Sequence, residues 1–302
     1  MADRYGSQEI MLQDNSQTRA HPFLQTSIFW AALRTLFSRA SLAMFRYIFT
    51  VLTQFILPQL VARLWPKRYR IVPVDHELDN LIAFEPQRVG VYLSFVGVWC
   101  RALGYTWNHF GRACAGDLAH FLDSLSNSYI QARSIYRRCL STTRRPAKAV
   151  NGQFRMMYFF DPHFNCVPSL HIMIVCAVFM EFEDIFLRHD QPAEAARLSA
   201  ALYRQAVAIS ESVVFVKQHS INCISAALYM VSNLYPRFDQ AAALEFAELL
   251  FIDQLPAPER RSILDHVTTL YESFMADSRC GAADYCSVLV DFLDSYQAPA
   301  WT

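Results

Sequence analysis

Two histidines, His171 and His219, are the residues of this chain best suited to do chemistry. Each stands at the edge of an apolar helical stretch: His171 closes Pro168-Ser169-Leu170-His171, and His219 follows Lys217-Gln218. In a phosphoryl transfer, one imidazole can attack phosphorus while a second protonates the departing oxygen. If the fold brings the two rings together, the pair predicts a phosphoryl-transfer site.

Local signals predict the helices that must bring the histidines together. Pro168-Ser169 is a good helix start, because proline fits the first turn and a serine oxygen can accept a free backbone N–H. This helix should reach about Leu187. After the polar break at 188–192, a second helical run should return to His219. At 1.5 Å per residue the two limbs are about 25 and 30 Å long, so an antiparallel pair places both histidines at one end.

Composition predicts an all-α protein with an acidic C-terminal part. Hydrophobic residues make up 53% of the 302 residues, with 23 Phe, 14 Tyr and only 8 Gly, which favours a helical core or lipid contact over a loop-rich β fold. Before Arg237 there are 23 basic and 16 acidic residues, and from Arg237 onward there are four and eleven. We therefore predict a flexible arm (1–24), a helical domain (25–236) that carries the histidine pair, and an acidic helical extension (237–302).

Two stretches are candidates for membrane spans. Ala40–Ala62 holds one charge, Arg46, and a kinking Pro58, whereas Val89–Trp107 contains Arg101. We predict a multi-pass integral membrane protein, with a peripheral or soluble helical protein as the alternative. The polar residues 1–17 do not resemble a cleaved signal peptide.

Other chemistry-bearing residues have plainer interpretations. The eight cysteines include no Cys-x-x-Cys pair, so we predict reduced, buried thiols without zinc or disulfides. Asp117, His120 and Asp123 lie at helical spacing and could bind a metal, but a hydrogen-bonded or solvated face is the commoner outcome. There is no Gly-rich phosphate loop, and no nucleic-acid partner is predicted.

A basic run lies just upstream of the first histidine. It includes Arg137, Arg138, Arg144, Arg145 and Lys148. The planar fork of arginine grips phosphate oxygens well, although a charge run is usually only solvated surface. Its position on the connection that leads to His171 favours a role in binding phosphate.

Three pieces of the sequence, in this order and spacing, resemble the type 2 phosphatidic acid phosphatase superfamily. That family carries a lysine separated by six residues from Arg-Pro, then Pro-Ser-Gly-His, then Ser-Arg followed after five residues by a histidine. The residues at these places here are Arg138 with Arg145-Pro146, Pro168-Ser169-Leu170-His171, and Ser212 with His219.

The resemblance covers about residues 130–226 and points to one branch of the superfamily. Leu170 in place of glycine, the preceding Asp161-Pro162 with Asn165-Cys166, and Lys217-Gln218-His219 are similar to the branch with inositol phosphorylceramide and sphingomyelin synthases.

The resemblance implies a membrane lipid phosphatase or head-group phosphotransferase that works through a phosphohistidine on a phosphorylated lipid. His219 would be the nucleophile and His171 the acid that protonates the departing alcohol. No metal or cofactor is implied. The phosphoryl oxygens would be held by Arg138, Arg145 and Ser169, with Lys217 as a possible helper.

Two positions depart from the family pattern. Val213 stands where the family has an arginine, and Cys223 stands where an aspartate orients the nucleophilic histidine. Because Asn222 lies three residues after His219, its amide oxygen could accept the ring N–H on a shared helix face. We therefore predict that Asn222 takes part in catalysis. The alternatives are a catalytically degenerate member that acts as a binding or scaffold protein, and a soluble interaction protein whose motifs are accidental.

Overall fold

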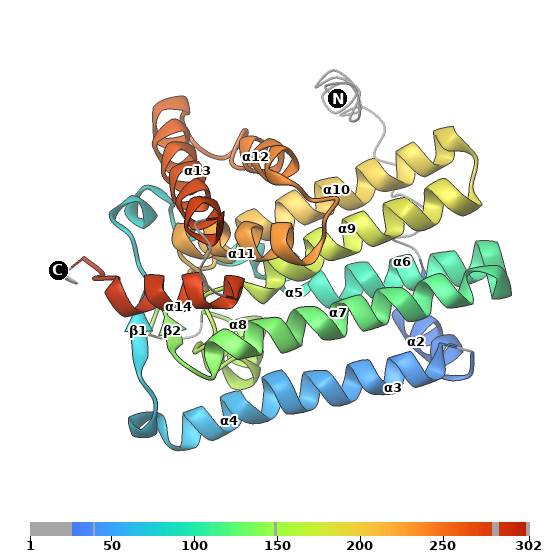
Figure 1. Cartoon of the computed structure of the whole chain (residues 1–302), viewed down its shortest axis with the longest axis horizontal. Helices are drawn as coiled ribbons and strands as arrows, with labels where there is room; N and C mark the ends of the chain where they lie inside the picture. The colour runs from blue at the N-terminus through green and yellow to red at the C-terminus, as the bar shows by residue number, and fades with distance from the viewer. Residues whose placement is uncertain (1–25, 39, 148–149, 280–283, 300–302) are drawn as a thin grey trace.

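The computed structural model describes residues 26–38, 40–147, 150–279 and 284–299, and its fold is almost entirely helical, as predicted (Figure 1). The predicted arm, residues 1–24, lies outside the described residues. The helices are α2 (Ile28–Leu36), α3 (Ser41–Thr50), α4 (Leu57–Leu64), α5 (Val89–Leu93), α6 (Phe95–Phe110), α7 (Ala115–Tyr136), α8 (Gly152–Phe160), α9 (Leu170–His189), α10 (Pro192–Phe215), α11 (Ile221–Leu234), α12 (Gln240–Glu248), α13 (Ala257–Arg279) and α14 (Tyr285–Ser295).

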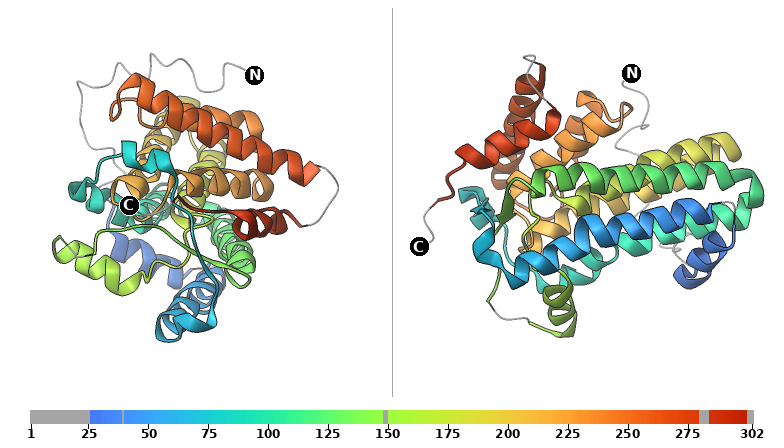
Figure 2. Two further views of the ribbon diagram at one scale, coloured as in Figure 1. Left: turned by 90° about the vertical axis from the view of Figure 1, so that its left-hand side faces the viewer. Right: turned by 60° about the horizontal axis from the view of Figure 1, so that its bottom comes forward.

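Helix α9 lies at the centre of a bundle of long helices and packs against α10, α7, α11 and α6 (Figures 1 and 2). Every residue from Leu170 to Met180 is buried, as expected for a helix that is apolar on all sides. Helix α10 returns antiparallel beside α9, which is the predicted pair. It ends at Phe215, so His219 lies in the connection to α11 and not at the end of a helix.

A long helical rod forms one outer edge of the bundle. Helix α3 continues through a π-helical segment, Val51–Ile56, into α4. Pro58 accounts for this segment, because it has no N–H to donate to the carbonyl of Gln54. Ser41–Leu64 is the one helix in the described part of the chain that is long and apolar enough to cross a membrane.

The structure shows how Arg46 of the first candidate span is paired and which helices form at the second candidate span. Arg46 forms an ion pair with Asp123 of α7, with 2.6 Å between Nη2 and Oδ2, so the predicted span carries no unpaired charge. The second candidate span, Val89–Trp107, is divided at Ser94 into α5 and α6, and neither helix is long and apolar enough to cross a membrane.

A small parallel sheet was not predicted. Strands β1 (Ile71–Pro73) and β2 (Leu140–Thr142) pair with Val72 opposite Ser141, and Ser141 also forms a bridge with Asn165. Three-residue strands give no alternation that could be recognised in the sequence. The sheet ties the segment before His171 to the end of α7.

The C-terminal helices pack onto the bundle and share its core. Helix α13 lies against α11, and α14 lies against α7 (Figure 1). The expected helices in the acidic extension are present. One link is Glu211 of α10, which accepts a 2.6 Å hydrogen bond from the N–H of Phe251 and lies 3.9 Å from Arg88.

Glu211 predicts a pH dependence of stability. Burial raises the pKa of Glu211 from 4.5 to about 7. Between these values the folded protein keeps a proton that the unfolded chain releases, so this residue lowers the free energy of unfolding as pH rises from about 4.5 to 7. The loss is at most about 3 kcal/mol. We expect the stability of E211Q to rise relative to the wild type over this range in chemical denaturation. A pH-independent difference between the two proteins would contradict this.

Candidate active site

The rings of His171 and His219 lie side by side although the two residues are 48 positions apart in the sequence. Their centroids are 5.8 Å apart and the ring planes are inclined by 65°. His171 sits in the first turn of α9, and His219 sits in the connection between α10 and α11. Both line one small pocket. The antiparallel pair of α9 and α10 thus produces the encounter that the sequence predicts.

Two contacts fix the orientation of the His219 ring. Its Nδ1 lies 3.1 Å from the carbonyl oxygen of Cys166, and its Nε2 lies 3.3 Å from Oγ of Ser169. A carbonyl can only accept, so Nδ1 carries the proton and donates it. The lone pair of Nε2 is then available, and it accepts from the Ser169 hydroxyl. This is the tautomer that a nucleophilic histidine needs.

Ser169 occupies the N-cap position of α9 but does not use its hydroxyl as a cap. The predicted cap hydrogen bond is therefore wrong, and the helix begins at Leu170. The hydroxyl points to Nε2 of His219 instead. At that position the same O–H could turn to a phosphoryl oxygen.

Aromatic rings enclose His171. Tyr92 stacks on it with centroids 4.3 Å apart, and Phe95 contacts it at 4.3 Å with tilted planes. The hydroxyl of Tyr92 donates to a carboxylate oxygen of Asp161 at 3.2 Å. These contacts hold the ring of His171 against the pocket.

Burial in the pocket favours the neutral form of both histidines. Burial lowers the pKa of His219 to about 4, and burial together with His219 lowers the pKa of His171 well below 6.5. A neutral His219 suits a nucleophile. A phosphate dianion beside His171 would raise the pKa of its ring, because an opposite charge favours the protonated form.

Residues of α7 and β2 form hydrogen bonds with the backbone of segment 161–169. The Tyr136 hydroxyl donates to the carbonyl of Pro168 at 2.6 Å, and the N–H of Val167 donates to Oγ of Ser141 at 2.8 Å. His163 adopts a positive φ of 67° and its Nε2 lies 2.8 Å from Oγ1 of Thr143. These bonds set the position of the Cys166 carbonyl that orients His219.

The turn that carries His219 depends on a left-handed residue. Lys217 has a φ of 56°, a conformation that costs a non-glycine residue about 1 kcal/mol. This turn lets the N–H groups of Gln218 and His219 both donate to the carbonyl of Val213 at 3.0 Å. Asp79 of the polar connector accepts from the N–H of Ile221 at 2.9 Å and fixes the start of α11.

The prediction that Asn222 orients His219 is wrong. His219 precedes α11, so the two residues do not share a helix face. Asn222 donates to the carbonyl of Val74 at 3.1 Å and to the Tyr296 hydroxyl at 2.9 Å, and its Oδ1 lies 2.8 Å from Nε2 of His266. Asn222 therefore links the bundle to the C-terminal helices.

Two of the predicted phosphate ligands point elsewhere. Lys217 donates to the carbonyl oxygens of Asp79 at 2.8 Å and Ile82 at 2.5 Å, so its role is to hold the turn. Arg138 is exposed after the end of α7 and is not among the residues that line the pocket. Both predictions follow from the family resemblance, which matches positions in the sequence and does not give the direction of a side chain.

Ser169 contacts His219, and Arg145 contacts the pocket residue Asp161, although neither of them lines the pocket. Arg145 donates to the carbonyl of Asp161 at 3.3 Å and lies over the ring of Tyr158 at 4.2 Å. Burial is the main reason why the pKa of His163 is lowered, and the positive charge of Arg145 lowers it further. Arg145 is therefore the arginine of the basic run that is best placed to meet an anion at this pocket.

Several pocket residues were not predicted. The lining of the pocket includes Phe55, Asp161, His163, Asn165, Cys166, Leu170 and Gln218 besides the two histidines. Three of these residues, Asp161, Asn165 and Cys166, belong to the segment that resembles the synthase branch of the superfamily. The resemblance implies no particular role for them. Phe55 comes from the outer rod, and nothing in the sequence relates it to the histidines.

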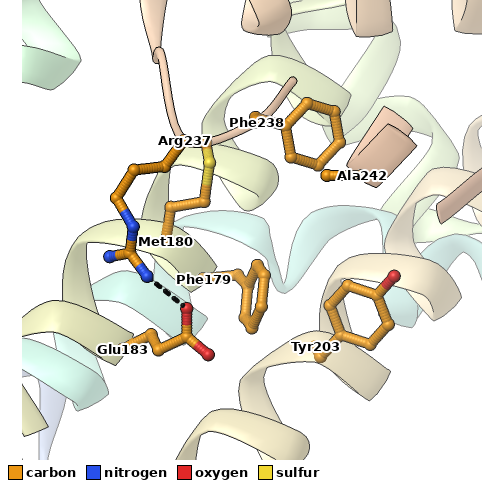
Figure 3. Close-up of a pocket in the computed structure, with 7 residues that line it drawn as sticks. All are labelled: Phe179, Met180, Glu183, Tyr203, Arg237, Phe238 and Ala242. Carbon is orange, nitrogen blue, oxygen red and sulfur yellow. Dashed lines mark hydrogen bonds and ion pairs between the residues drawn. The ribbon is translucent and has the colours of Figure 1, made fainter. Parts of the chain in front are cut away.

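The pocket is small in this conformation. Its volume is about 10 Å³, room for about one water molecule, so a phosphoryl group would have to widen it. A second hollow of about 20 Å³ lies farther along α9 (Figure 3), where Arg237 pairs with Glu183 at 3.1 Å among the rings of Phe179, Tyr203 and Phe238. Its described lining has no nucleophile.

The possible metal residues on α7 are engaged with other groups. Asp117 pairs with Arg188 at 2.6 Å and with His189 at 2.7 Å, and Asp123 pairs with Arg46. His120 is exposed and lies 3.8 Å from Glu181. Within the described ranges, no cluster of His, Cys, Asp and Glu is suited to a metal.

No protein-family model, curated protein or solved structure was found to match this chain. The resemblance to the type 2 phosphatidic acid phosphatase superfamily therefore stays a prediction from three motifs.

Proposed function

We propose that this protein is a lipid phosphatase or head-group phosphotransferase of the type 2 phosphatidic acid phosphatase kind. The observation that carries the proposal is the pairing of His171 and His219, with Nδ1 of His219 bound to a carbonyl and Nε2 directed to Ser169. This arrangement leaves a nucleophilic nitrogen and a second imidazole at one pocket.

The proposed reaction has two halves. In the first, Nε2 of His219 forms a bond to phosphorus, the bond from phosphorus to the alcohol oxygen breaks, and that oxygen takes a proton from His171. Fixed donors such as Arg145 and Ser169 would stabilise the charge on the equatorial oxygens. In the second half, a hydroxyl oxygen attacks phosphorus and frees His219. Water as acceptor gives hydrolysis, and a lipid hydroxyl gives transfer.

The proposal is tested by trapping the intermediate. Purified protein is mixed with ³²P-labelled phosphatidic acid in mixed micelles and quenched, and protein-bound phosphate, free phosphate and lipid products are measured. We expect bound phosphate that is labile in acid and stable in base, as a phosphohistidine is. Folded protein that forms neither bound phosphate nor product would favour the degenerate binding protein instead.

We also propose that the outer rod contacts a lipid bilayer. Of the 24 large apolar side chains exposed among the described residues, ten lie on the outer rod, and five more lie on the residues that flank it between Ile28 and Trp65. The outer surface of α10, by contrast, carries exposed Arg197 and Arg204. An apolar surface of this extent is typical of membrane contact. The multi-pass arrangement expected from the sequence stays a prediction.

Membrane contact predicts a loss of binding when charge is placed on the rod. Phe45 and Phe49 lie one turn apart on α3 and are 60% and 68% exposed. In the double variant F45E/F49E we expect binding to vesicles of phosphatidylcholine and phosphatidylserine to fall at least about tenfold in a sedimentation assay. L187E changes a leucine that is 56% exposed on α9 and serves as the matched control. Equal binding by all three proteins would contradict lipid contact at the rod.

A further inference from the structure

Gln218 presents an unpaired amide inside the pocket. The residue is fully buried and lines the pocket beside His219, and neither Nε2 nor Oε1 of its side chain has a hydrogen-bond partner among the described residues. Leaving a buried polar group unpaired costs about 1–3 kcal/mol. An amide in this state, beside two paired histidines, points to a ligand that completes its hydrogen bonds.

The hydrogen-bonding capacity of the Gln218 amide limits the kinds of ligand that can bind to it. A phosphoryl oxygen of a bound dianion accepts hydrogen bonds only, so it would satisfy Nε2 of Gln218 and repel Oε1. A hydroxyl group both donates and accepts, and it can satisfy either atom. The volume of about 10 Å³ beside Gln218 leaves room for about one such group.

The local backbone directs Gln218 to this position. The left-handed turn at Lys217 and the hydrogen bond from the N–H of Gln218 to the carbonyl of Val213 fix the residue. The carbonyl of Gln218 in turn lies 3.6 Å from Sγ of Cys166, the residue whose own carbonyl orients His219. Gln218 and His219 are thus held by the same turn and the same segment.

We propose that Gln218 binds the hydroxyl group of the acceptor in the second half of the reaction, and this rests on the proposed function. The acceptor is water or an alcohol of a lipid. Its oxygen forms a bond to phosphorus while the bond from phosphorus to Nε2 of His219 breaks and returns its electron pair to that nitrogen. The proton of the acceptor passes to His171, which lost one to the leaving alcohol in the first half. Gln218 holds the hydroxyl in line with the bond that breaks.

The test compares wild type with Q218M, which keeps the size of the side chain and removes both polar atoms. The donor is p-nitrophenyl phosphate, and the acceptor is water alone in one arm and added diacylglycerol in mixed micelles in the other. The single-turnover burst of p-nitrophenol reports the first half, and decay of acid-labile protein-bound phosphate reports the second. We expect Q218M to form the phosphoenzyme within about threefold of the wild-type rate and to lose it about 10- to 100-fold more slowly.

The arms also identify the acceptor. Slower decay in both arms assigns Gln218 to water as well as to alcohol, and slower decay only with diacylglycerol assigns it to the lipid alcohol. Decay within threefold of wild type in both arms would overturn the role of Gln218 while leaving the proposed function standing. Wild-type protein that forms no phosphoenzyme would overturn the proposed function itself.

A stability measurement separates this role from a structural one. Replacing an unpaired buried amide by an apolar group of the same shape is neutral or stabilising. We therefore expect the Tm of Q218M to equal or exceed that of wild type. A lower Tm together with slower formation of the phosphoenzyme would show that the amide supports the fold, and would overturn the proposal.

Discussion

The H219A variant is expected to form no phosphoenzyme and to lose phosphate release by at least about 10³-fold. The reason is that the Cys166 carbonyl holds the proton of His219 on Nδ1, so Nε2 on the other side of the ring has a free lone pair for attack. Among the described residues that line the pocket, no other imidazole is held in this way with its Nε2 free. Among the described residues, the ring of His171 contacts other rings and no carbonyl oxygen, and His163 is occupied by Thr143. The measurement is single-turnover labelling followed by quantification of protein-bound phosphate.

The control for H219A is H120A, the same substitution at an exposed histidine on α7. H120A should keep wild-type labelling and turnover. Circular dichroism and thermal unfolding show whether H219A is folded. Folded H219A that still carries acid-labile phosphate would place the nucleophile on another residue.

The H171Q variant is expected to lose 10²- to about 10⁴-fold in activity on a substrate with an alkyl leaving group. An alkoxide leaves poorly unless it is protonated, and His171 is the imidazole that lies beside His219. The loss should be less than about tenfold with p-nitrophenyl phosphate, because p-nitrophenolate leaves without a proton. The measurement is the ratio of kcat/KM for the two substrates.

This ratio distinguishes an acid from a packing residue. His171 stacks against Tyr92 and Phe95, so its replacement also removes ring contacts. A loss of packing would lower the rates on both substrates by the same factor. Equal losses would therefore rule out His171 as the acid, whereas a ratio that changes by 10-fold or more supports it.

Much of the fold could be predicted because it follows from helical periodicity. The polar break at 188–192 and the apolar runs on both sides of it specify α9 and α10, and their similar lengths bring His171 and His219 to one end. The C-terminal helices α12–α14 likewise follow from amphipathic runs that Pro256, Pro258 and Gly281 separate in the sequence. Long periodic elements depend on local signals, which a single sequence contains.

The details of the site depend on contacts between distant residues. The pairing of Val72 with Ser141 anchors the segment before His171, and Asp79 fixes the turn after His219. Neither contact has a periodic signal. The prediction for Asn222 failed for a related reason, since a shift in the start of α11 by two residues changes which side chains share a face.

The orientation of His219 by the carbonyl of Cys166 has a consequence for mutational studies. A scan of side chains cannot remove this acceptor, because every residue at position 166 supplies the same backbone oxygen. The role that a carboxylate would have is thus encoded in the path of the chain from Asp161 to Ser169. Its loss would be seen on changing the anchors Ser141 or Tyr136, far from His219 in sequence, and a screen for catalytic residues would then assign chemistry to two residues that never touch the substrate.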